Sequence, residues 1–248
     1  MKEINQRGDD MTISPYALQQ DWRIQWQGAP ENRIDRLRCE SPKEIKALQT
    51  LAHTGIMSGK QLLHLYGLPR KQLKKMEKER KLHRHELISK REGRDHILPI
   101  YTLGPSGAVV AELPHFQPHY WQTYGPEDVL QRLAFVQLYS FFQPAPLFPA
   151  PQPFTGGIEV HNRLLYVYAI SGKVDDLLRY LTWEDPRYQE RIILIAEKLG
   201  HVRPFLQHFK EAKVRITTHE EIFQDQPWQN LFYFEENGEL VKEQPNTV

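Results

Sequence analysis

Two helix-start signals of the same kind constrain the fold of this chain more than any other feature. Ser41-Pro42-Lys43-Glu44 and Ser58-Gly59-Lys60-Gln61 each place a serine three residues before an acid or an amide, which is the pattern of a capping box. The apolar residues after Ser41 repeat at helical spacing and stop at Gly55, and the second set stops at Gly67. The sequence therefore predicts two short helices in close succession.

A third helix and a hairpin are expected next. Pro69 fits the first turn of a helix that runs to about Leu82, and residues 86–103 predict two strands around the turn Glu92-Gly93-Arg94. A short helix, a tight turn, a third helix and a hairpin in this order are typical of a winged helix-turn-helix. We therefore expect such a domain over residues 41–115, with its third helix placed to enter the major groove of DNA.

The third helix is predicted to have one basic face and one buried face. At 100° per residue an arc of about 140° holds Arg70, Lys71, Lys74, Lys75, Lys78 and Lys81, and Leu73 and Met76 fall on the opposite side. Residues 60–96 contain twelve Lys or Arg and five Asp or Glu, a local charge of +7 in a chain whose net charge is only +1. Such a surface suits duplex DNA, because each cation that meets a phosphate releases counterions. A solvated surface helix is the alternative interpretation.

The candidate DNA contacts lie on the third helix, beside it and at the tip of the hairpin. Lysine is a point charge that suits phosphates, whereas base edges favour the bidentate geometry of Arg, Asn and Gln. Arg70 and Gln72, both in the first turn of the third helix, are therefore the candidate base readers. The full predicted set is Lys60, Arg70, Lys71, Gln72, Lys74, Lys75, Lys78, Lys81, Arg84, Lys90, Arg91 and Arg94.

Four further regions are expected around this domain. Residues 1–40 form a polar N-terminal extension, in which the alternation at 22–26 (Trp-Arg-Ile-Gln-Trp) predicts a half-buried strand that packs on the next domain. Residues 116–142 form a connecting region. The five prolines of residues 143–155 forbid a helix and predict an extended linker, and residues 156–248 predict a small α/β domain.

The connecting region contains an unusually apolar helix. Gly125-Pro126-Glu127-Asp128 marks its start, and the apolar residues that follow, as far as Phe142, lie on more than one side. Such a helix must be buried. It either joins the two halves of the chain or, as residues 126–142, pairs with its copy in a homodimer that binds two half-sites.

Strands and helices alternate in the C-terminal region. A hairpin around residues 161–163 comes first, followed by a helix at 173–181 and a continuous apolar strand at 191–196. A helix at 202–211 and a strand at 214–217 are expected next. The remaining predicted elements are a short helix capped by Thr218, a strand at 231–234 and a turn at Asn237-Gly238. The central strands are expected to be parallel, and the fold class of the whole chain is α+β.

Three stretches of the first domain carry a family resemblance. They are residues 45–55 (Ile-Lys-Ala-Leu-Gln-Thr-Leu-Ala-His-Thr-Gly), residues 58–62 (Ser-Gly-Lys-Gln-Leu) and residues 101–108 (Tyr-Thr-Leu-Gly-Pro-Ser-Gly-Ala), together with the basic third helix. In these the chain resembles the replication-relaxation proteins of plasmids and other mobile elements in Gram-positive bacteria. The resemblance implies a winged helix followed by a region similar to a restriction-endonuclease core, and a role in plasmid replication, DNA relaxation or transfer.

The carboxylates of an active endonuclease core are missing from this sequence. Such a core holds a metal with one acid on a first strand and Asp/Glu-x-Lys on the next. Glu159 is the candidate for the first acid, but the strand at 164–170 offers no carboxylate, and Glu197-Lys198 lacks the intervening residue. We therefore expect a degenerate, non-catalytic relative of that core, without enzyme activity and without a cofactor.

Other side chains give weaker signals. His83, His85 and His96 with Cys39 are candidate metal ligands, but the first two lie beside basic residues, where histidine suits phosphate, so no metal is expected. The single cysteine rules out an intramolecular disulfide and fits a reducing compartment. With no membrane-length apolar run and no signal-peptide pattern, a cytoplasmic location is expected.

Three functions follow from these patterns. Double-stranded DNA is the expected partner, bound for replication, transfer or transcriptional control. A protein-interaction adaptor whose basic helix meets an acidic partner is the alternative. A metal-dependent nuclease that uses Glu159 is the third.

Overall fold

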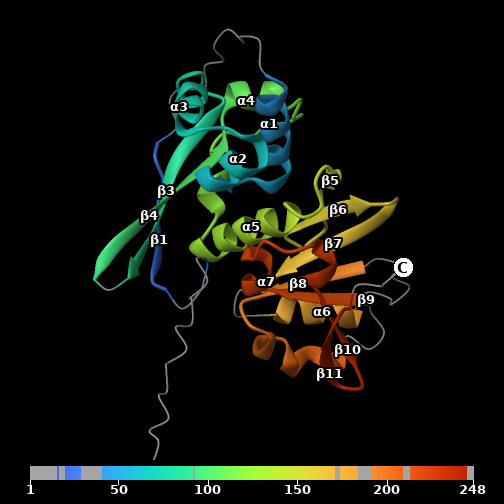
Figure 1. Ribbon diagram of the computed structural model, residues 1–248. Coiled ribbons are helices and arrows are strands. Elements are labelled where there is room, and N and C mark those ends of the chain that lie inside the picture. Colours follow the sequence, from blue (N-terminus) through green and yellow to red (C-terminus); the bar gives the residue numbers. More distant parts are fainter. Residues whose placement is uncertain are drawn as a thin grey trace, which may run out of the picture.

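The computed structural model describes residues 16, 20–28, 41–91, 93–170, 174–183, 191–208 and 213–244. It is a mixed α+β structure with two sheets (Figure 1). Most of the predicted N-terminal extension, including Cys39, lies outside the described residues. Within the described part, every helix is too short or too polar to cross a lipid bilayer.

The first sheet has four antiparallel strands in the order β1-β3-β4-β2 and is accompanied by four helices. The long hairpin of β3 and β4 extends away from the rest of the molecule (Figure 1). The elements are β1 (Trp22–Gln25), α1 (Pro42–Thr54), β2 (Met57–Ser58), α2 (Gly59–Tyr66), α3 (Arg70–Lys78), β3 (Leu82–Arg91), β4 (Arg94–Leu103) and α4 (Pro105–Val110).

The two predicted capping boxes are present. The Ser41 side chain accepts a hydrogen bond from the backbone N–H of Glu44, and the Glu44 carboxylate accepts one from the N–H of Ser41. Ser58 and Gln61 make the same reciprocal pair at the start of α2. Gly67 ends α2 at φ 63°, a left-handed conformation that glycine adopts without steric cost. The local signals of the sequence therefore fix the starts of α1 and α2 as predicted.

The strand predicted near residues 22–26 is also present. Trp22–Gln25 forms β1, which pairs antiparallel with β3 so that Ile24 lies opposite Leu87. Trp22, Ile24 and Trp26 are half-buried and pack against the largest core, whereas Arg23 and Gln25 are exposed. The alternation in the sequence thus matches an edge strand with one buried face.

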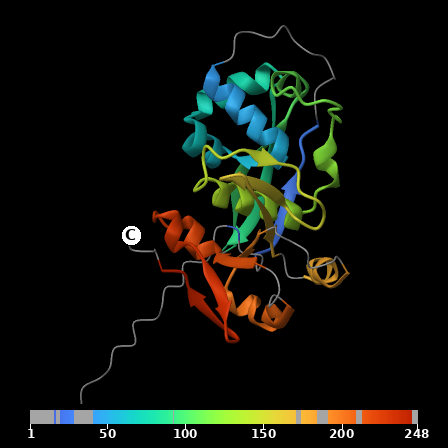
Figure 2. The same ribbon diagram turned by 90° about the vertical axis from the view of Figure 1, so that its right-hand side faces the viewer.

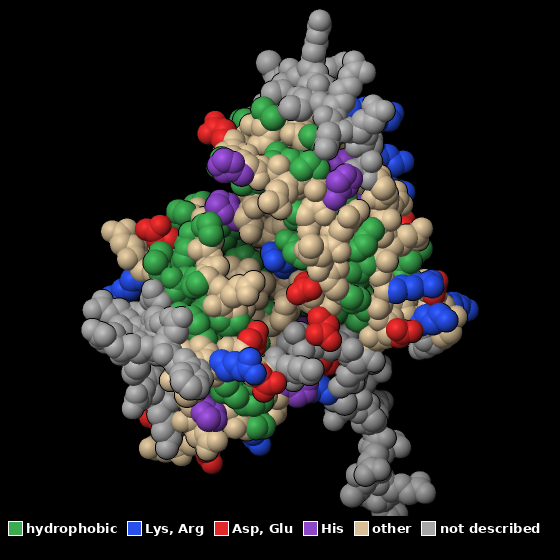
Figure 3. All heavy atoms as spheres, turned by 180° about the vertical axis from the view of Figure 1, so that it is seen from behind, with side chains coloured by type: hydrophobic (Ala, Val, Ile, Leu, Met, Phe, Trp, Pro, Cys, Tyr) green, Lys and Arg blue, Asp and Glu red, His purple; other side chains and the backbone are tan. Residues whose placement is uncertain are grey.

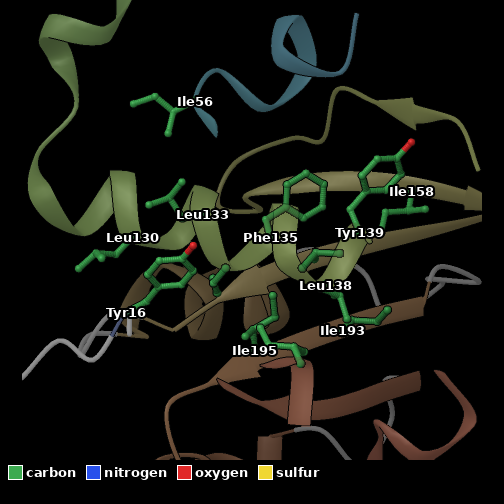
Figure 4. Close-up of a cluster of buried hydrophobic side chains, with 14 of the residues drawn as sticks. Tyr16, Ile56, Leu130, Leu133, Phe135, Leu138, Tyr139, Ile158, Ile193 and Ile195 are labelled. Carbon is green, nitrogen blue, oxygen red and sulfur yellow. The ribbon is translucent and has the colours of Figure 1, made fainter. Parts of the chain in front are cut away.

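Helix α5 (Pro126–Tyr139) lies between the two sheets (Figures 1 and 2). It contacts α1, β1 and β2 of the first half, and β7 (Arg163–Ala169) and α7 (His219–Phe223) of the second. Figure 4 shows its side chains between Ile56 on one side and Ile158, Ile193 and Ile195 on the other. All of its larger apolar residues are buried within the chain: Val129, Leu130, Leu133, Phe135, Val136, Leu138 and Tyr139.

Polar side chains of α5 and α2 reinforce this connection. Gln131 and Gln137 donate to the carbonyl oxygens of Ala169 and Ile222 in the second half, and Gln61 of α2 donates to that of Leu133 at 2.7 Å. The sequence left two roles open for this helix, the joining of the two halves and dimerisation. The structure shows the first, since the apolar surface offered for a second copy is already covered by the chain itself.

The second sheet has seven strands in the order β11-β10-β9-β8-β7-β6-β5. The predicted parallel centre is confirmed, because β7 pairs parallel with β8 and β8 with β9, while the outer pairs are antiparallel. After a 3₁₀ turn, η1 (Tyr120–Thr123), and α5, the elements are β5 (Leu147–Phe148), β6 (Gly156–Val160), β7 (Arg163–Ala169), α6 (Asp175–Trp183), β8 (Arg191–Ala196), η2 (Leu199–His201), η3 (Arg203–His208), β9 (Lys213–Thr218), α7 (His219–Phe223), η4 (Trp228–Asn230), β10 (Tyr233–Glu236) and β11 (Glu239–Lys242).

Two predicted segments of this half differ in detail. The helix expected at 202–211 is a 3₁₀ helix, η3, as far as residue 208, and residues 209–212 lie outside the described part. The proline-rich segment contributes a strand, since Leu147 of β5 pairs with Ile158 of β6. Residues 143–155 are thus attached to the second sheet and do not only span a gap.

Candidate nucleic-acid interface

Helix α3 is anchored by one face and exposes the other. Leu73 and Met76 are 3% and 0% exposed and pack into the core formed by α1, α2, β4 and α4. The exposed residues of the helix are all basic: Arg70, Lys71, Lys74, Lys75 and Lys78. Seen from behind, Lys and Arg side chains lie along the edge of the molecule that holds α3 and the tip of the hairpin (Figure 3). One face of a short helix therefore presents a concentrated positive charge.

The helix ends earlier than predicted, at Lys78. Arg80 adopts a left-handed conformation with φ 55°, its N–H donates to the carbonyl of Glu77, and the N–H of Lys81 donates to that of Met76. These two bonds define a Schellman motif, which usually contains glycine at the position of Arg80. Since the sequence has arginine there, it gave no signal that the helix would stop.

This early end corrects the assignment of Lys81 to the exposed basic face. The chain reverses at Arg80, and the Lys81 side chain turns inward, where it is 2% exposed. Its ammonium lies 2.8 Å from Oε2 of Glu79 and 3.8 Å from Oε2 of Glu44, which completes the capping box of α1. Lys81 is thus a buried ion-pair residue that ties the end of α3 to the start of α1.

The Leu-Gly-Pro-Ser-Gly motif holds α4 against this same turn. The N–H of Gly104 donates to the carbonyl of Lys81, and the N–H of Ser106 donates to that of Arg80. A Cβ added at Gly107 would lie 2.2 Å from the carbonyl oxygen of Lys81, and one at Gly104 would lie 2.3 Å from that of Arg80. Both glycines therefore permit a backbone contact that positions the end of α3.

Gln72 and Lys43 are placed where the sequence did not predict them. Gln72, a candidate base reader, is half-buried and donates a hydrogen bond to the Glu44 carboxylate, so it faces α1 and not the exposed side. Lys43, in the first turn of α1, is exposed and lines a hollow with four lysines of α3: Lys71, Lys74, Lys75 and Lys78. No local pattern brings Lys43 to α3, because only the packing of the two helices does so.

A second hollow lies between α2, the start of α3 and the hairpin, and its cationic lining residues are Lys60, Arg70 and Arg84. Arg84 lies on β3, since that strand starts at Leu82, and forms an ion pair with Glu86 at 2.7 Å. The exposed apolar residues Leu63 and Ile97 line the same hollow. This surface therefore combines cations with apolar contacts.

One acid lies within this basic surface. Burial raises the pKa of Glu77, although the nearby charges of Arg84, Lys74 and Arg70 lower it. The same neighbours surround Tyr101, whose phenol has a pKa raised by burial and by Glu77. Glu77 thus partly neutralises the charges of Arg70, Lys74 and Arg84.

The tip of the hairpin is exposed and basic. Lys90 and Arg94 are exposed, and Arg91 lies at the end of β3, where its backbone pairs with that of Arg94. Gly93 provides the φ of 75° that the tight turn requires. Closer to the body, Asp95 forms an ion pair with Arg23 of β1. The structure thus places Lys90 and Arg94 at the tip of the hairpin, at a distance from α3.

The two histidines at the start of β3 lie in the interior. His85 is fully buried. Its Nδ1 accepts from the N–H of Gln27 at 3.0 Å and its Nε2 lies 2.9 Å from Oγ1 of Thr102, so the neutral ring satisfies both atoms. The rings of His83 and His85 lie 5.4 and 5.1 Å from that of Trp121. Burial lowers the pKa of His83 to about 4 and that of His85 to about 3. These side chains therefore stabilise the core and do not face a phosphate.

Of the candidate metal ligands, Cys39 lies outside the described residues, and His83 and His85 are buried. Among the residues that the structure describes, no three His, Cys, Asp or Glu side chains form a group that could hold a metal ion. Glu159 lies on β6, opposite Leu164 of β7. In the comparison with known proteins, no protein family, no curated protein and no solved structure matches the chain.

Proposed function

We propose that this protein binds double-stranded DNA, with α3 in the major groove and the tip of the β3–β4 hairpin on the flanking backbone. In this proposal residues 41–115 are a winged helix-turn-helix, in which α3 is the recognition helix and the hairpin is the wing. The observation that carries it is the exposed face of α3, on which five basic residues and no acid are exposed.

The dimensions of α3 suit this role. An α-helix with its side chains is about 10–12 Å across, which fits the major groove of B-DNA, about 12 Å wide. The nine residues of α3, at a rise of 1.5 Å each, extend over about 13 Å. The αL turn at Gly67 and the following Pro69 separate α3 from α2 by a short connection. Leu73 and Met76 anchor the helix in the core and fix its orientation. Binding therefore does not have to bear the entropic cost of ordering the helix that carries the cations.

The residue types favour contacts with phosphates over contacts with bases. Four of the five exposed residues are lysines, which bind phosphates as point charges. Of the two predicted base readers, Gln72 is hydrogen-bonded to Glu44, whereas Arg70 is exposed in the first turn, where helix-turn-helix proteins contact base edges. We therefore assign most of the affinity to the backbone and any base preference to Arg70.

The process that this binding serves is proposed from the family resemblance. Replication, transfer or transcriptional control of a plasmid or another mobile element fits a chain that is similar to replication-relaxation proteins over its first domain. The second half is proposed as a non-catalytic relative of an endonuclease core, which sets oligomeric state or binds a partner. The absence of a carboxylate from β7 supports this assignment.

The proposal is tested by fluorescence anisotropy of labelled duplex DNA over a series of salt concentrations. The variant Lys71→Ala/Lys74→Ala/Lys78→Ala should weaken binding to all duplex sequences. It should also flatten the slope of log K against log salt by about 0.9 per lost phosphate contact, or about 2.7 in total. These lysines are exposed, so the thermal midpoint should change little.

A matched control removes three exposed cations from the second half. The variant Arg179→Ala/Lys198→Ala/Arg203→Ala lowers the net charge equally but leaves α3 intact. It should bind duplex DNA with nearly the affinity and salt slope of the parent protein. Equal weakening by both triple variants would show that net charge, not the α3 face, governs binding. No DNA binding by the parent protein, with retention on an acidic protein, would favour the adaptor alternative.

A further inference from the structure

A cavity of about 640 Å³ opens on the second sheet, away from the α3 surface, and has a strongly cationic wall. It lies at the end of the sheet where the parallel strands β7, β8 and β9 begin. Arg163, Arg191 and Lys213, the first residues of these three strands, line it together with Arg215. Its volume lies within the range of about 300–1,000 Å³ that is typical of small-molecule sites.

The register of the strands explains why these cations meet. Arg191 pairs with Lys213, and Ile193 pairs with Arg215, while Leu165, two residues after Arg163, pairs with Arg191. Side chains of paired residues in parallel strands point to the same face, and alternate residues of one strand do so too. All four cations therefore lie on the face of the sheet that α5 covers, just beyond the end of the shared core.

The cavity contains more positive than negative charge. Arg215 donates to both carboxylate oxygens of Glu243, with Nε at 2.7 Å from Oε2. Among the described residues that line the cavity, Glu243 is the one carboxylate, and none of Arg163, Arg191 and Lys213 has an ion-pair partner in the described part of the chain. Burial and the neighbouring guanidinium groups lower the pKa of Arg191. An anion between these residues would relieve their mutual repulsion.

Aromatic side chains also line the cavity. The ring of Phe142 lies 6.3 Å from that of Trp228 and 6.3 Å from that of Phe232. Trp228 is 46% exposed, which leaves a large flat apolar surface at the cavity. Aromatic side chains of this kind stack on planar rings such as nucleobases. The cavity thus offers a stacking surface and an anion-binding surface within one small volume.

We propose that this cavity binds a nucleotide, with its base against Trp228 and Phe142 and its phosphates on Arg163, Arg191 and Lys213. Arginine and lysine are the usual phosphate ligands. The cavity is concave and small, which suits a free nucleotide better than an extended acidic peptide. This site is separate from α3, so it does not depend on DNA binding there.

The test is isothermal titration calorimetry of the full chain with ATP, GTP, CTP and UTP in turn, and with inorganic phosphate. At least one nucleoside triphosphate should bind more tightly than phosphate alone. The variant Arg163→Gln/Arg191→Gln should weaken that binding by roughly ten- to a hundred-fold, because two charge-assisted contacts are lost. The matched control Arg203→Gln, an exposed arginine outside the cavity, should leave it unchanged.

Two further variants separate this proposal from folding defects and from the proposed DNA function. Trp228→Ala, at an exposed side chain, should weaken nucleotide binding and leave the thermal midpoint nearly unchanged. The α3 triple variant should keep full nucleotide affinity even if its DNA affinity is lost. Absence of binding by all four nucleotides would overturn the proposal, and so would an equal affinity for inorganic phosphate. Binding of single-stranded DNA that is blocked by Arg163→Gln/Arg191→Gln, with no binding of any mononucleotide, would assign the cavity to a nucleic-acid strand instead and would also overturn it.

Discussion

Replacement of Lys81 by methionine tests whether this residue belongs to the interior or to the exposed basic face of α3. Methionine has a similar length and keeps the apolar stem, but it removes the ammonium. That ammonium lies 2.8 Å from Glu79 and 3.8 Å from Glu44. The Lys81 and Glu44 side chains are each 2% exposed. The substitution therefore leaves a buried carboxylate without this cation, while the contacts of Glu44 with Gln72 and the N–H of Ser41 remain.

The cost follows from the burial of this pair. Removal of one partner from a buried ion pair typically costs about 3–5 kcal/mol, because the remaining charge is left in a medium that solvates it poorly. Unfolding of a chain of this length has an entropy of roughly 0.5 kcal/mol per kelvin. We therefore expect Lys81→Met to lower the thermal midpoint by about 6–10 °C.

Lys78→Met is the matched control, since Lys78 lies three residues earlier but is exposed on α3. Its free energy of unfolding should change by less than about 0.5 kcal/mol, whereas its DNA affinity should fall. Calorimetry gives the midpoints, and anisotropy on the same duplex gives the affinities below the midpoint of each variant. An unchanged midpoint for Lys81→Met, with a loss of DNA affinity like that of Lys78→Met, would refute the assignment of Lys81 to the interior.

Three other predictions follow from described contacts. Arg70→Ala should remove the preference for one duplex sequence over others, measured by competition at fixed salt, whereas Gln72→Ala should leave it intact; the reverse result would exchange their roles. Gly107→Ala should destabilise the fold by about 3 kcal/mol in urea unfolding, because its Cβ meets the Lys81 carbonyl, while Gly200→Ala, whose Cβ meets open space, should be neutral. The free energy of unfolding should fall as the pH drops from 6.5 toward 4, because the histidines of the unfolded chain take up protons near pH 6.5 and the buried ones do not; each buried histidine should cost about 2 kcal/mol at pH 5. His85→Gln should weaken this pH dependence, measured by urea unfolding at several pH values, and a parent protein whose free energy of unfolding does not change with pH would contradict the prediction. The buried histidines with lowered pKa values are His83, His85 and His219.

The parts of the fold that the sequence predicted are those with local causes. The serine caps at Ser41 and Ser58 act within one turn, and the alternation of residues 22–26 reflects one buried face of one strand. The end of α3 depends instead on an arginine in a left-handed conformation, Arg80, which nothing in the local pattern indicates. The difference of about four residues in helix length was enough to move Lys81 from the surface to the interior.

Long-range packing determines the features of the fold that the local sequence pattern could not predict. The apolar pattern of α5 showed that the helix is buried, but only the contacts with both sheets decide between an internal role and a dimer. Lys43 joins the α3 lysines, and Gln72 turns toward α1, through the packing of two helices whose relative position no spacing rule gives. The cationic cavity likewise arises from strand register, which brings Arg163, Arg191 and Lys213 together from distant parts of the sequence.

The burial of α5 against both sheets limits how this protein can be divided or recombined. A fragment cut before α5 would leave Ile56, Leu87 and Ile100 without their partners, and one cut after it would carry an uncovered apolar helix into water. The half that contains α3 is therefore not a portable module that can be fused unchanged to another protein. Any exchange between chains has to carry α5 together with a surface that fits it.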